Sequence, residues 1–160
     1  DVIMRSEPAQ RILSARRVVP SFAAARDLIR ELGDSARGLK TNGPLGRLTA
    51  IAHAQEFEID RIDVEIGFVV ESEVRGEIRL ANGEQLSLRE LPAVERMATC
   101  VRVGPPERAH LITGKIGLFM EANGYALAGP SREVFLQPPR LDRMEEAVVE
   151  MQFPVEPVVA

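Results

Sequence analysis

A single carboxylate beside an aromatic ring is the feature of the sequence that most suggests chemistry. Glu133 lies in a strand-like stretch, Arg132 to Leu136, that follows Gly129-Pro130. Because side chains alternate along a strand, Glu133, Phe135 and Gln137 share one face. A delocalised cation and an aromatic face would together offset the cost of burying the carboxylate. The pattern favours a site for a small apolar or cationic molecule, and the alternative is a solvated strand glutamate.

Residues with other kinds of chemistry show no recognisable pattern. His53 and His110 have no metal-ligand spacing with each other or with Cys100. The sequence also lacks a nucleophile elbow, a glycine-rich phosphate loop and a zinc motif. Cys100 stands in an apolar stretch, which is typical of a small buried residue. We therefore predict no metal site and no cofactor.

The composition is that of one globular domain. The chain has 160 residues, of which 45% are hydrophobic, so it can bury one core and we expect a single domain over residues 1–160. The net charge is −4, and no run of lysine or arginine is long enough to follow a phosphate backbone, which argues against DNA binding by this chain itself. Its one cysteine excludes an internal disulfide and suits a cytoplasmic location.

An internal repeat organises the chain. The segments Val64–Glu71 and Val149–Glu156 are identical at five of eight positions. Two further anchors keep the order: Arg5, Pro8 and Ala9 match Arg89, Pro92 and Ala93, and Gly43-Pro44 matches Gly129-Pro130. We read two copies, about residues 1–72 and 85–157, with a connecting hairpin at about 73–90.

Each copy predicts a strand, a helix and two further strands. The predicted strands are 11–19, 46–53 and 62–71 in the first copy, and 97–103, 131–137 and 147–156 in the second. Ser21 is a candidate cap for a helix that runs from Phe22 to Gly33, and the second helix follows Gly104-Pro105-Pro106 and ends at Gly124. Asn82-Gly83 predicts a tight hairpin between strands 74–80 and 85–91. Glycines 114 and 117 inside the second helix indicate close packing or ligand approach. The result is an α+β fold with approximate two-fold symmetry, an antiparallel sheet and two helices.

These features resemble the GyrI-like effector-binding domain. The resemblance rests on Asp1–Arg5 leading to Pro8–Ile12, on the proline turns before both helices, on Gly129-Pro130 before Arg132–Phe135, and on the closing Val149-Glu150-Met151. In that family two strand-helix-strand-strand units enclose a central ligand pocket. The domain occurs as the C-terminal half of MerR-type and AraC-type transcription regulators, and also alone.

The resemblance assigns roles to four residues. In multidrug-sensing members a glutamate pairs with lipophilic cations among aromatic side chains, and Glu133 falls at its position. Phe135, Tyr125 and Phe22 are the other candidate ligand contacts, although core packing is the alternative for Phe22 and solvent for Tyr125. Arg47, the repeat mate of Glu133, could instead neutralise it. With one tyrosine, six phenylalanines and no tryptophan, an aliphatic or smaller ligand is also compatible.

The resemblance implies a ligand-sensing domain that transmits its ligand-bound state to a DNA-binding part outside this chain. We expect the N-terminal strand to transmit this change. Since the sequence opens on Asp1, we expect a piece of a longer regulator, which could form a homodimer. No segment has the composition of a membrane span. Two alternatives stay open: a stand-alone hydrolase of electrophilic small molecules with Glu133 as general base and Tyr125 as partner, and a protein-binding inhibitor module.

Overall fold

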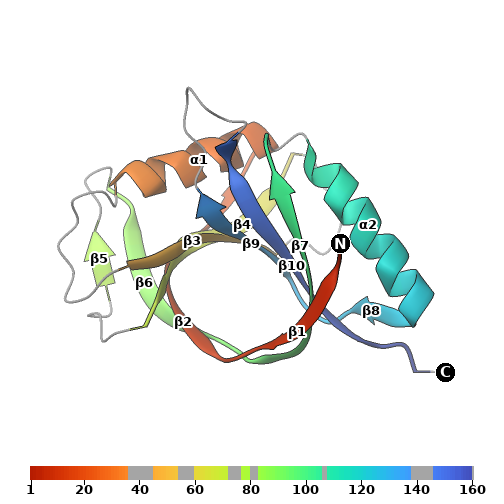
Figure 1. The fold of residues 1–160 in the computed structure, drawn as a ribbon. Coiled ribbons are helices and arrows are strands. Elements are labelled where there is room, and N and C mark those ends of the chain that lie inside the picture. Colours follow the sequence, from red (N-terminus) through yellow and green to blue (C-terminus); the bar gives the residue numbers. More distant parts are fainter. Residues whose placement is uncertain are drawn as a thin grey trace. The chain divides into compact units, whose positions relative to one another are not determined.

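The computed structural model describes residues 1–35, 45–53, 60–71, 77–79, 83–105, 108–137 and 146–159. These residues form two helices and ten strands (Figure 1). In chain order they are β1 (Ile3–Glu7), β2 (Gln10–Val19), α1 (Phe22–Ser35), β3 (Leu45–Ala52), β4 (Ile62–Val70), β5 (Glu77–Arg79), β6 (Gln85–Leu91), β7 (Val94–Val103), α2 (Ala109–Asn123), β8 (Tyr125–Leu127), β9 (Ser131–Gln137) and β10 (Val148–Pro157). The predicted α+β class is confirmed.

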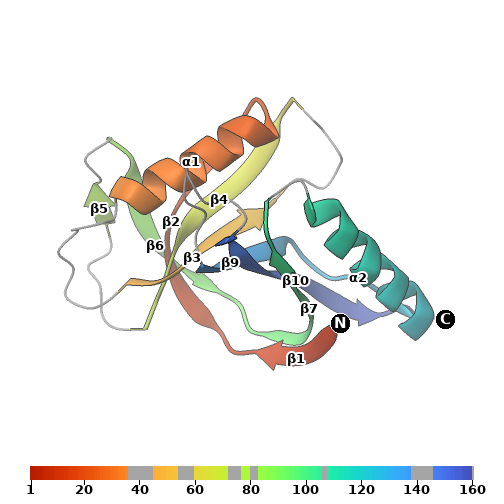
Figure 2. The same ribbon diagram turned by 45° about the horizontal axis from the view of Figure 1, so that its top comes forward.

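The chain forms two compact units. The helix-1 unit is Ala9–Pro92, and the helix-2 unit combines Asp1–Pro8 with Ala93–Ala160. All strand pairs within each unit are antiparallel, in the order β3-β4-β2-β6-β5 in the helix-1 unit and β1-β7-β10-β9 in the helix-2 unit, where β8 also pairs with β10. Helix α1 packs on β4 and β2 (Figure 2), and α2 packs on β7 and β8 (Figure 1).

The first strands of the two repeats are exchanged. Strand β1 belongs to the first copy in sequence but pairs with β7 of the second, where Ile3 lies opposite Thr99. Its repeat mate β6 pairs with β2 of the first copy, where Arg89 lies opposite Ile12. Each unit is therefore completed by a strand from the other copy, which the sequence repeat does not reveal.

The helix ends follow from local chemistry, with two corrections. The Ser21 hydroxyl accepts a hydrogen bond from the Ala24 N–H at 3.0 Å, as expected for a cap. Gly124 has a φ of 69° and ends α2 as predicted. The prediction that Gly33 ends α1 was wrong: its φ is not positive and the helix continues to Ser35. Helix α2 begins at Ala109, after the predicted proline turn.

Each sheet has one face toward its helix. In the helix-1 unit, a Cβ added at Gly33 of α1 would lie 3.6 Å from Leu48, so the row that contains Leu48 and Phe68 faces the helix. The repeat mate of Phe68 is Phe153, and the alternation along β10 then puts Met151 on the helix side and Glu150 on the opposite side. Of the polar groups described below, Glu133 lies on the helix side, and the clusters of Glu65 and Glu150 lie on the opposite side.

The glycines differ in what surrounds them. At Gly67 of β4, an added Cβ would overlap the Leu13 carbonyl oxygen and lie 2.6 Å from the Ser14 Cα, so only glycine allows β2 to approach this closely. At Gly114 and Gly117, no atom of the described residues lies within 4 Å of an added Cβ. Close packing therefore does not explain these two helical glycines.

This contrast gives a stability prediction. We expect Gly67→Ala to lower the free energy of unfolding by about 1–3 kcal/mol, because backbone atoms must shift to admit the methyl group. Gly114→Ala is the matched control: it should be neutral or stabilising by up to about 1 kcal/mol, because alanine favours the helix. Urea unfolding followed by circular dichroism measures both, and equal effects would contradict the close approach at Gly67.

Candidate functional site

Glu133 lies on the helix side of the helix-2 sheet. It stands opposite Met151 of β10, which stands opposite Cys100 of β7. Two residues along β9, Phe135 lies opposite Val149 on the same face and is 5% exposed. The predicted pairing of the carboxylate with an aromatic ring on one face thus exists in the structure, beside the apolar side chains of Met151 and Val149.

The Glu133 carboxyl is poorly compensated. Burial raises its pKa above the usual value, and the positive charge of Arg102 opposes this only in part. Within the described part of the chain, no hydrogen bond or ion pair reaches the carboxyl. A half-buried carboxyl in this position gains free energy from any ligand that covers it and brings a donor or a positive charge.

The other predicted ligand contacts lie elsewhere. The ring of Tyr125 stacks on Phe119 of α2, with centroids 6.3 Å apart, and Tyr125 is half-buried. Tyr125 pairs with Pro157, six residues along β10 from the Met151 that faces Glu133, a separation of about 20 Å at roughly 3.4 Å per residue. The register therefore does not bring Tyr125 to Glu133.

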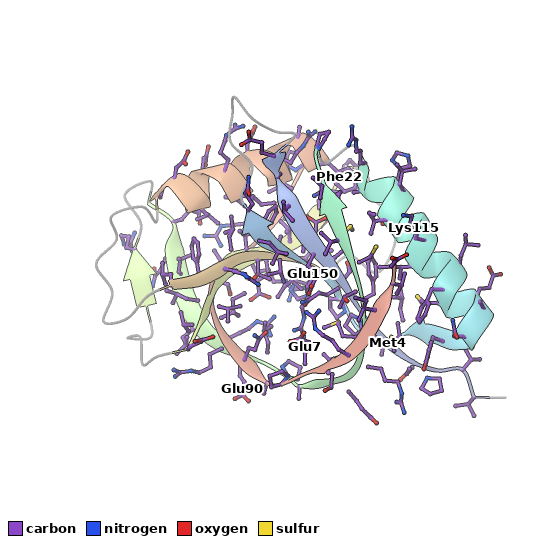
Figure 3. The ribbon with its side chains drawn as sticks, in the orientation of Figure 1. Met4, Glu7, Phe22, Glu90, Lys115 and Glu150 are labelled. Atoms are coloured by element: carbon purple, nitrogen blue, oxygen red, sulfur yellow. The ribbon has the colours of Figure 1, made fainter. Side chains whose placement is uncertain are left out.

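Two further candidates belong to the helix-1 unit. Phe22 is the first residue of α1 and is 52% exposed (Figure 3). Arg47 lies in β3 and is also exposed. The roles suggested for both toward Glu133 remain predictions. The turn Gly43-Pro44, which matches Gly129-Pro130, lies outside the described residues.

A second polar cluster, which the sequence reading missed, surrounds Glu65 on the face of the helix-1 sheet opposite α1. Its Oε2 accepts hydrogen bonds from Ser14 Oγ at 2.6 Å and Arg89 Nε at 2.7 Å. Its Oε1 accepts one from Arg89 Nη2 at 2.5 Å and one from His53 Nε2 at 2.8 Å. His53 Nε2 must carry the proton, because a carboxylate only accepts.

These partners determine the protonation of Glu65. Its side chain is 3% exposed, and burial alone raises its pKa. The hydrogen bonds from Arg89, Ser14 and His53 outweigh burial and lower the pKa of Glu65 to about 2. A carboxylate with both oxygens occupied is an anchor and a poor general base. Ser14 donates to Glu65 and has no bond to His53, so the cluster does not activate a serine nucleophile.

The repeat places a related cluster in the helix-2 unit. Glu150, the repeat mate of Glu65, forms a bidentate ion pair with Arg5, the repeat mate of Arg89. Gln152 donates to Glu150 at 2.7 Å, and Arg5 Nε also donates to Glu7 at 2.5 Å. Figure 3 labels Glu7 on β1 and Glu150 on β10. In each unit an arginine from the exchanged strand therefore binds a glutamate of a central strand. The signal that could have revealed this is the repeat itself, because the two arginines are 84 positions apart in the sequence and the two glutamates 85.

Comparison with known proteins identifies the family. Residues 1–156 match the sequence profile of the GyrI-like small molecule binding domain. The chain belongs to the GyrI-like family. A comparison with curated protein sequences finds no match.

Solved structures share the GyrI-like fold. The EcmrR C-terminal domain is 24% identical, with a TM-score of 0.78 over 99% of this chain and 98% of that one. In a complex of EcmrR with DNA the TM-score is 0.80, and this chain spans 58% of that protein's length. A hydrolase from Listeria innocua is 13% identical, with a TM-score of 0.64 over 97% of this chain and 91% of that one. SAV2435 bound to tetraphenylphosphonium is 11% identical, with a TM-score of 0.60 over 98% and 94%. At these identities the likeness establishes the fold alone.

In the part of the chain that the structure describes, no helix is long and apolar enough to cross a membrane. The same residues contain no group of three or more acidic, histidine or cysteine side chains arranged to hold a metal ion.

The Glu65 cluster predicts a large cost for one substitution. Arg89→Met should lower the free energy of unfolding by about 3–5 kcal/mol, because it leaves a buried carboxylate without its main countercharge. Arg16→Met is the control: Arg16 makes a similar bidentate bond to Asp63, at 2.9 and 2.8 Å, but the Arg16 side chain is exposed and the Asp63 carboxylate keeps access to water, so the loss should be much smaller. Similar losses from the two variants in chemical denaturation would contradict the anchoring role of Glu65.

The lowered pKa of Glu65 also predicts an acid effect. The unfolded chain binds a proton at Glu65 near pH 4.3 and the folded chain only near pH 2, so this stabilisation is complete above about pH 4.3 and disappears as the pH falls to about 2. The difference in unfolding free energy between the wild type and Glu65→Gln should therefore shrink across this window. Denaturation series at pH 6, 4, 3 and 2 measure it, and a constant difference would contradict the assignment.

Proposed function

We propose that this GyrI-like domain senses a small lipophilic molecule through the Glu133 face of the helix-2 sheet, and that the ligand presents a positive or hydrogen-bond-donating group to Glu133. One observation carries the proposal: a half-buried carboxyl without a hydrogen-bond partner in the described residues lies on one face with Met151 and the buried ring of Phe135. SAV2435, which shares the fold, binds the lipophilic cation tetraphenylphosphonium.

We further propose that the domain is the effector-binding part of a MerR-type transcription regulator. The likeness to the EcmrR C-terminal domain, and to EcmrR bound to DNA, supports this role. A ligand can shift such a regulator only if it binds two conformations unequally. Strand β1 offers a route for the signal, because Arg5 binds Glu150, and Glu150 adjoins the Met151 that faces Glu133.

We favour ligand binding over catalysis as the function of the Glu133 face. The raised pKa of Glu133 would suit a general base, and the hydrolase from Listeria innocua shows the same fold. Against this, the tyrosine expected to assist Glu133 stands about 20 Å away along β10. We therefore place hydrolysis second.

The test is calorimetric titration with tetraphenylphosphonium and with triphenylphosphine oxide, a neutral compound of comparable shape. We expect the wild type to bind the cation, and Glu133→Gln to weaken that binding by at least tenfold, or about 1.5 kcal/mol, the lower range for a bond to a charged group. Binding of the neutral compound should change little.

Glu95→Gln is the matched control, because Glu95 lies in the same unit with a side chain 82% exposed and should leave both affinities unchanged. Equal cation affinity in the wild type and Glu133→Gln would refute the role of Glu133.

A further inference from the structure

The outward face of α2 is apolar although it is exposed. Helix α2 packs on β7, and its buried residues are Ile112 and Ile116. Leu111 and Leu118 lie two turns apart on the outward side and are 56% and 69% exposed. A helix with apolar residues on both sides is typical of one that is covered on both sides.

Helix α1, the repeat mate of α2, does not share this feature. Beyond its first turn, the exposed residues of α1 are Arg26, Asp27, Glu31 and Asp34, a composition typical of a helix face in water. On α2, Lys115 lies at the flank of the outward face and is labelled in Figure 3. The apolar outward face is therefore a property of α2 and not of the repeated fold.

Two glycines flatten the same face. Gly114 and Gly117 lie between Leu111 and Leu118, and both are exposed. No atom of the described residues lies within 4 Å of a Cβ added at either position. Each glycine costs the helix about 1 kcal/mol relative to alanine. Because no side chains project there, a second helix can approach α2 to about 8 Å, the short end of the range for packed helices.

The charged and titratable side chains at the two ends of α2 indicate which helix fits this face. Glu121 lies in the last turn, His110 lies in the first turn, and Arg108 directly precedes the helix. Each of these residues is at the unfavourable end, because a helix carries a partial positive charge at its N-terminus and a partial negative charge at its C-terminus. An antiparallel copy of α2 reverses this relation, since Glu121 of one copy then lies beside the N-terminal turn of the other.

We propose that the outward face of α2 is a self-association surface, on which α2 of a second copy packs antiparallel about a two-fold axis. In this arrangement Gly114 of one copy lies opposite Gly117 of the other, and Glu121 lies opposite His110. Leu111 of each copy meets Leu118 of the other beside the glycines. A two-fold axis repeats every contact, so one helix face supplies both halves of the interface. The inference is independent of the proposed ligand site.

The length of α2 limits the strength of this contact. The helix has 15 residues and is about 22 Å long. Two helices of this length bury less surface than the roughly 1,200–2,000 Å² of a stable interface. We therefore expect a weak monomer–dimer equilibrium of the domain, with a Kd between about 10 μM and about 1 mM.

The experiment is sedimentation equilibrium of the 160-residue chain across this concentration range. Leu118→Glu should weaken association at least tenfold, because the dimer would bury a charge. Val103→Glu is the matched control: Val103 is 58% exposed and lies on the side of β7 away from α2, so association should not change.

A substitution at the glycines separates association from folding. Gly114→Gln should leave the monomer as stable as the wild type or more stable, because glutamine favours a helix over glycine. Its side chain nevertheless prevents the close approach of a second helix, so association should weaken at least tenfold. Thermal unfolding at a concentration where the chain is monomeric measures the first effect, and sedimentation measures the second.

A charge exchange tests the antiparallel direction. In a dimer of His110→Glu, two pairs of glutamates face each other, and in a dimer of Glu121→Lys, each new lysine faces His110 and the positive end of a helix. Each variant alone should therefore associate more weakly than the wild type. An equimolar mixture should associate at least threefold more tightly than either variant, because the new glutamate of one faces the new lysine of the other.

Four results would overturn the proposal. The first is a chain that remains monomeric at about 1 mM, and the second is equal weakening by Leu118→Glu and Val103→Glu. The third is association of Gly114→Gln as tight as that of the wild type. The fourth is a mixture of the two charge variants that associates no more tightly than its components, which would exclude the antiparallel arrangement.

Discussion

The buried carboxylate of Glu65 is hydrogen-bonded to side chains from three neighbouring segments of the helix-1 unit. It lies on β4 and accepts hydrogen bonds from Ser14 of β2, Arg89 of β6 and His53 at the end of β3. A charge buried this deeply is tolerated only when its oxygens are satisfied, so all three neighbouring segments must keep their register. Gly67 contributes by allowing β2 to approach β4 closely. The sheet and its central charge thus depend on each other.

The helix-2 unit contains both a satisfied and an unsatisfied carboxyl. Glu150 is held by Arg5 and Gln152 on one face of β10, while Glu133 lies on the other face with Arg102 as its distant countercharge. The environments push the pKa values of Glu65 and Glu133 in opposite directions from a common starting value. This contrast distinguishes the anchoring carboxylate of Glu65 from the Glu133 carboxyl, to which we assign the proposed ligand contact.

The exchange of β1 and β6 connects these features to the signalling role that we propose. Each exchanged strand carries the arginine that binds a glutamate in the centre of the receiving unit. Two neighbouring residues of β10 are involved: Glu150 binds Arg5 of β1, and Met151 lies opposite Glu133 of β9. A change at the proposed ligand face and a change in the first strand would therefore act on the same short segment. In a GyrI-like domain that informs another part of a regulator, such a segment is a physically reasonable point of coupling.

Much of this architecture was predictable from local patterns. Apolar spacing, the Ser21 cap, the Gly124 end and the repeated strand segments gave the elements and the family, because these signals depend on neighbouring residues alone. The sequence even contained both members of each Arg–Glu pair. Only the tertiary structure decided that Arg5 binds Glu150 and that Arg89 binds Glu65. It also decided that Tyr125 lies far from Glu133, and that Arg102 lies on the same sheet face as Glu133. Those facts depend on strand exchange and register, which bring together residues far apart in the chain and are not encoded in any short segment.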